Sequence, residues 1–149
     1  MKAFLLMAVA AMCCVGCSSM NYVREKVPGK VLSIHKTEAT FEGTKKQPCH
    51  FMTALCPDRC NHGGTIAVFK IDKYVDYTLV GQYGDAKQTT FMVPIADGQG
   101  NPTAEATEGL VDVIKTLEPG TKVELDWTHT YVDDGFVVEP RRLVTRLSF

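Results

Sequence analysis

Three cysteines and two histidines are concentrated between residues 48 and 64. The segment reads Pro-Cys-His-Phe-Met-Thr-Ala-Leu-Cys-Pro-Asp-Arg-Cys-Asn-His-Gly-Gly, and its reactive side chains belong to Cys49, His50, Cys56, Cys60 and His62. Thiolates and imidazoles are ligands for Zn²⁺ and Cu(I), and two thiols can instead form a disulfide. The sequence therefore predicts that this segment, called here the Cys/His loop, carries either a disulfide or a metal ion.

A metal site would depend on the spacing of Cys56 and Cys60. These residues are four positions apart, which places their thiols one turn apart if the segment is helical. Together with Cys49 and either His62 or His50 they make a four-ligand set for zinc or copper, although the spacings match no standard zinc pattern.

Residues 56–60, Cys-Pro-Asp-Arg-Cys, also resemble the C-P-D-x-C motif of the thioredoxin-like copper chaperones that help to assemble cytochrome oxidase. The resemblance implies that Cys56 and Cys60 are copper ligands or a redox-active dithiol. In that family the motif leads into a long helix, whereas here it leads into a predicted strand. The βαβ units that surround the motif in that family are also missing.

The N-terminus has the layout of a secretory signal peptide. Lys2 is followed by an almost wholly apolar run over residues 3–15, and then by Gly16, Cys17 and two serines. A membrane-spanning helix needs roughly 20 apolar residues, so this run is too short to remain as a span. Export would place the remaining thiols in an oxidising compartment, where disulfides are the default.

Residues 15–17, Val-Gly-Cys, resemble the end of the lipobox of bacterial lipoproteins. The resemblance implies that residues 1–16 are removed, that Cys17 carries a lipid, and that the protein is anchored in a bacterial cell envelope. Ser18 rather than Asp after the cysteine favours the periplasmic side of the outer membrane. Cys14 stands where that family usually has Leu, so a soluble secreted protein is the alternative.

Removal of the signal and lipidation of Cys17 would leave three thiols, of which one must stay free or bond a second molecule. The remaining 133 residues suffice for one domain, expected at residues 29–149 after a lipid-anchored tether at 17–28. They carry 15 basic and 17 acidic side chains, a balance that argues against a nucleic-acid partner.

Apolar periodicity predicts the elements that must position these side chains. Strands are expected at residues 29–36, 65–77, 88–95, 121–131 and 143–149, and a helix with Thr103 as its N-cap is expected to end before Pro119. This order of three strands, one helix and two strands resembles the OB-fold, a five-stranded Greek-key barrel. The expected fold class is thus mainly β with one helix.

Trp127, His129 and Tyr131 share one face of the strand at 121–131 and are predicted to line a groove or the barrel interior. His35 is predicted to face solvent, and Arg141 and Arg142 to form a charge pair beside Glu139 at a hairpin edge. The sequence has no recognisable Ser–His–Asp set, phosphate-binding loop or catalytic carboxylate pair, so no catalytic residue is predicted.

Two hypotheses follow from these features. The first is a non-enzymatic envelope lipoprotein that binds or assembles an unknown envelope protein or small ligand. Its Cys/His loop would be stabilised by a disulfide or a metal. The second is a metal-handling or thiol-redox protein centred on Cys56 and Cys60.

Overall fold

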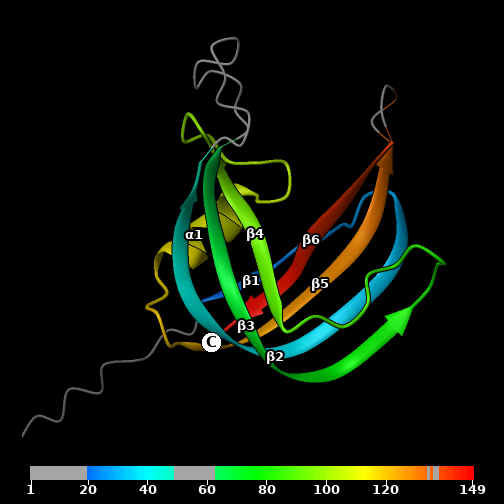
Figure 1. Cartoon of the computed structure of the whole chain (residues 1–149), viewed down its shortest axis with the longest axis horizontal. Coiled ribbons are helices and arrows are strands. Elements are labelled where there is room, and N and C mark those ends of the chain that lie inside the picture. Colours follow the sequence, from blue (N-terminus) through cyan, green and yellow to red (C-terminus); the bar gives the residue numbers. More distant parts are fainter. Residues whose placement is uncertain (1–19, 49–62, 134, 136–137) are drawn as a thin grey trace, which may run out of the picture.

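The computed structural model describes residues 20–48, 63–133, 135 and 138–149, which fold into strands and one short helix (Figure 1). After one additional short strand, the order is the predicted one of three strands, one helix and two strands. In chain order the elements are β1 (Asn21–Val23), β2 (Lys30–Gln47), β3 (Gly64–Leu79), β4 (Thr90–Asp97), α1 (Glu108–Lys115), β5 (Lys122–Asp133) and β6 (Val138–Ser148).

The strands form one antiparallel sheet in the order β1-β6-β5-β2-β3-β4. Because β1 and β4 are edge strands that each pair on one side only, the sheet is open, and the predicted five-stranded closed barrel is not confirmed. The additional strand is β1, which pairs with β6 through Tyr22 and Leu147 and lies in the segment predicted to be a tether. Three residues with one buried side chain are too few to produce a recognisable alternation.

The sheet is strongly curved because its central strand β2 is long and irregular. β2 has 18 residues and pairs with β5 on one side and β3 on the other, with register shifts against β3 at Lys36/Thr37, Glu38/Ala39 and Phe41/Gly43. Such bulges bend a strand and increase its twist. The sheet consequently curls, and α1 lies against its concave side (Figure 1).

The helix begins at Glu108, four residues later than predicted, with Thr107 as its N-cap. The predicted cap, Thr103, instead donates its hydroxyl to the carbonyl of Pro94 on β4 at 2.6 Å. This bond fastens the preceding turn to the sheet edge and removes the side chain from a capping role. No helix in the described ranges has the length and apolar character needed to cross a membrane.

The core fills the space between the helix and the concave side of the sheet. The helix contributes Leu110, Val111, Val113 and Ile114 to this core. The large side chains that face it from the strands are Phe41, Phe69, Phe91, Leu125, Trp127, Val144 and Leu147.

The Cys/His loop connects β2 to β3, whose last paired residues are Gln47 and Gly64. It is therefore a hairpin connection with adjacent ends. Residues 49–62 themselves lie outside the described part of the chain, as do residues 1–19 with Cys17. The predictions made for those cysteines and for His50 and His62 remain predictions.

Candidate functional site

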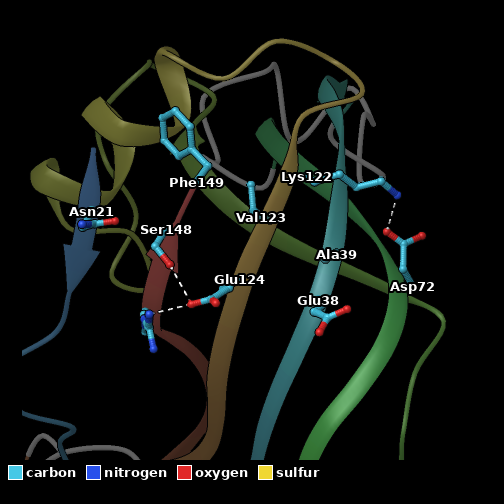
Figure 2. A pocket seen from close by; sticks show the side chains of 10 residues that line it. Asn21, Glu38, Ala39, Asp72, Lys122, Val123, Glu124, Ser148 and Phe149 are labelled. Atoms are coloured by element: carbon cyan, nitrogen blue, oxygen red, sulfur yellow. Dashed lines mark hydrogen bonds and ion pairs between the residues drawn. The ribbon is translucent and has the colours of Figure 1, made fainter. Parts of the chain in front are cut away.

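An open groove of about 540 Å³ crosses the sheet from β1 to β3 (Figure 2). Its position follows from strand register, because Asn21, Ser148, Glu124 and Glu38 are paired in one row across four strands. The residues that line the groove are Asn21, Glu38, Ala39, Asp72, Lys122, Val123, Glu124, Arg146, Ser148 and Phe149.

Ion pairs rim the groove. Glu124 pairs with Arg146 at 2.5 Å and accepts the hydroxyl of Ser148 at 3.1 Å (Figure 2). Asp72 pairs with Lys122 at 2.8 Å, and this hydrogen bond holds the pKa of the Asp72 carboxyl below its ordinary value. The two ion pairs place charges of both signs along the edges of the groove.

The chemistry of the groove suits binding. Its lining combines three carboxylates and two cations with the apolar side chains of Val123 and Phe149. Its hydroxyl, on Ser148, donates to Glu124, and no histidine lies among the lining residues to activate it. A ligand with both charge signs and an apolar portion would match this surface.

A second polar cluster is buried beneath residues 80–89, the β3–β4 loop. Ser33 accepts the backbone N–H of Asp85 at 3.1 Å and lies 2.9 Å from Nε2 of His35. The carboxylate of Asp85 accepts hydrogen bonds from Arg142 at 2.6 and 2.9 Å and lies 3.4 Å from Nδ1 of His129. Asp85 thus helps to fasten the loop over two histidines, together with the bond from the backbone N–H of Gln88 to the hydroxyl of Tyr74.

The prediction that His35 faces solvent is wrong, because its side chain is fully buried. The alternation in Leu32 and Ile34 suggested that those residues form the inner face. A register shift between Val31 and Ser33 changes the phase of the strand, so that Ser33 and His35 point inward. The imidazole stacks on Trp127 at 4.5 Å, and burial lowers the pKa of His35 to about 4.

The three residues predicted to line a groove occupy the interior of this region. Trp127 is fully buried between His35 and Phe91, with ring centroids 4.5 and 4.3 Å away. His129 is buried beside Asp85, and Tyr131 is half-buried at the end of the row. None of the three lines the groove of Figure 2.

Ser33 and His35 have the separation of a nucleophile and its base, yet the arrangement does not suit catalysis. Ser33 is fully buried, so a substrate cannot reach its hydroxyl without movement of the β3–β4 loop. The carboxylate of Asp85 is directed to Arg142 and His129, so it does not orient His35.

The sequence indicated neither the buried cluster nor the groove. Nothing in the local sequence links Asp85 to Arg142, which is predicted to belong to the charge pair beside Glu139. In the structure Glu139 pairs with Arg141 at 3.2 Å, whereas Arg142 pairs with Asp85.

Within residues 20–48, 63–133, 135 and 138–149, no three His, Cys, Asp or Glu side chains are grouped as a metal site. No protein-family model matches the sequence, and no curated protein or solved structure is significantly similar to it. The site must therefore be interpreted from its own geometry.

Proposed function

We propose that this protein is a bacterial cell-envelope lipoprotein, anchored through Cys17, whose domain is a non-enzymatic binding or assembly module. The observation that supports this most is the position of β1, which begins at Asn21, four residues after Cys17. A folded domain that starts immediately after a lipobox-like Val-Gly-Cys is the arrangement expected if residues 1–16 are a removed signal.

The groove of Figure 2 is the proposed binding surface for an envelope protein or small ligand. It is open, it lies across five strands of a hydrogen-bonded sheet, and it is lined by charged side chains of both signs. A rigid surface of this kind loses little conformational entropy when it binds. An OB-like barrel is the related architecture that we propose, since the element order from β2 onward agrees with it.

A metal-handling or thiol-redox protein centred on Cys56 and Cys60 is the alternative. The observation in its favour is that the β2–β3 pairing brings Gln47 and Gly64 together. The three thiols and two imidazoles between them are therefore confined to one hairpin connection, which favours their meeting in a shared site.

Lipidation is tested by producing the full chain in a bacterial host supplied with a labelled fatty acid. We expect label and membrane association in the wild type, both lost in the Cys17→Ser variant. Cys49→Ser is the matched control and should retain both. A wild-type chain that is secreted without label and begins after residue 16 would contradict the proposal and support the soluble alternative.

Binding through the groove is tested by placing a photo-crosslinking residue at Glu38 and, as a control, at Lys87 on the β3–β4 loop. Both positions are exposed, but only Glu38 lines the groove. A defined adduct at Glu38 alone, lost on adding the Glu124→Lys substitution, is the expected result. The same adducts at both positions would count against the groove.

A further inference from the structure

Three exposed apolar side chains lie along the β1 edge of the sheet, at the two ends of β1 and beside its start. Met20 immediately precedes β1, Val23 ends it, and Phe149 follows Ser148, which pairs with Asn21. The C-terminus accordingly lies next to the start of β1 (Figure 1). Several exposed apolar side chains along one short edge favour a surface that contacts something apolar.

The chain length between the anchor and this edge limits what that partner can be. From Cys17 to Asn21 there are four residue steps, which span at most about 14 Å when fully extended. The polar interfacial region of each leaflet is itself roughly 5–8 Å thick. A lipid on Cys17 therefore keeps the start of β1 close to the headgroups.

A comparable group of exposed apolar side chains lies elsewhere on the molecule and serves as a control for the group at the β1 edge. It consists of Val75, Leu79, Val80 and Tyr83, around the end of β3. In Figure 1 the end of β3 and the C-terminus lie on opposite sides of the molecule. Only the group at the β1 edge is held near the anchor.

We infer that the β1 edge is a membrane-contact surface, with Met20, Val23 and Phe149 placed in the interfacial region of the lipid bilayer. The inference rests on the proposed lipidation of Cys17. The acyl chains provide the anchoring, since each buried CH₂ contributes to it, and the three side chains set the orientation of the domain.

This orientation has a consequence for the groove. Asn21 and Phe149 lie at one end of its lining, whereas Glu38 and Asp72 lie at the other (Figure 2). The end with Asn21 and Phe149 faces the bilayer. A partner therefore enters from the end that carries Glu38 and Asp72.

Quenching of tryptophan fluorescence by brominated lipids tests the contact. The lipidated, full mature protein is reconstituted in vesicles of phosphatidylcholine and phosphatidylglycerol with brominated acyl chains. The variant is Val23→Trp and its matched control is Val75→Trp, because the two native side chains are 65% and 61% exposed. The fluorescence of the buried Trp127, measured in the wild-type protein, is subtracted from that of both variants.

We expect quenching in the Val23→Trp protein to exceed that in the Val75→Trp protein at least about threefold. Met20→Trp reports on the same edge and replaces Val23→Trp if circular dichroism shows that the latter is misfolded. Equal quenching in a lipidated, vesicle-bound protein would overturn the membrane contact and leave the proposed function intact. Absence of lipid by intact mass would overturn both.

Discussion

Asp85 and Arg142 form a two-point contact that joins the β3–β4 loop to β6. Nε and Nη2 of the guanidinium donate to the two carboxylate oxygens at 2.6 and 2.9 Å, across 57 positions in sequence. The Asp85 side chain is only 13% exposed, and its backbone N–H donates to Ser33 on β2. One residue thus ties the loop to two strands.

Substituting Arg142 by Gln should lower the free energy of unfolding by about 2–3 kcal/mol, because a largely buried carboxylate loses its charged partner. Urea denaturation at pH 7 measures the loss. The neighbouring pair of Arg141 and Glu139 is the control, since Glu139 is half exposed. Arg141→Gln should lower the free energy of unfolding by less than about 0.5 kcal/mol. Equal losses in the two variants would contradict the stabilising role assigned to the contact between Asp85 and Arg142.

Stability should decline as the pH falls from about 6.5 to about 4. Burial, opposed by Asp85 and reinforced by His129 and Arg142, lowers the pKa of His35 from 6.5 to about 4. Between these values the unfolded chain takes up a proton that the folded chain excludes, so the folded state loses up to roughly 3 kcal/mol. Below about pH 4 this contribution is constant.

The variant His35→Phe keeps an aromatic ring on Trp127 and should remove that part of the pH dependence. Urea denaturation midpoints at several pH values measure it. The fluorescence of Trp127, the single tryptophan, should change near pH 4 in folded wild type and not in the variant. Identical pH profiles for the two proteins would contradict the assignment.

Gly29 should be irreplaceable at the start of β2. Its φ is +80°, and an added Cβ would lie 1.9 Å from the carbonyl oxygen of Tyr131. Gly29→Ala is expected to cost about 3 kcal/mol or more, from backbone strain together with steric overlap. Gly120 has a φ of +95° and open space around it, so Gly120→Ala isolates the strain alone at about 1 kcal/mol. Thermal melts that rank the variants in reverse order would contradict this explanation.

Thiol counting and intact mass of the mature protein should distinguish the interpretations of the Cys/His loop. A disulfide makes the chain lighter by two hydrogen atoms and leaves one reactive thiol among Cys49, Cys56 and Cys60. Zinc or copper retained in the native spectrum and removed by a chelator would favour the metal interpretation instead. Three reduced thiols without metal would contradict both.

Local patterns in the sequence were sufficient for most of the elements. The alternation over residues 121–131 predicts β5 nearly to its observed ends, because Val123, Leu125 and Trp127 recur at every second position on one face. The apolar spacing of Leu110 and Ile114 located the helix. Its start was misplaced because Thr103 bonds to β4, a contact between residues nine positions apart.

The sequence alone therefore determined a mainly β domain with one helix, the order of its elements from β2 onward, and the lipobox-like N-terminus. Only the tertiary structure decided that the sheet stays open, since closure depends on accumulated twist and bulges rather than on residue type. It also decided that His35 is buried. A register shift on β2 and a loop held by Asp85 and Arg142 place that histidine inside, and neither is visible in the local sequence.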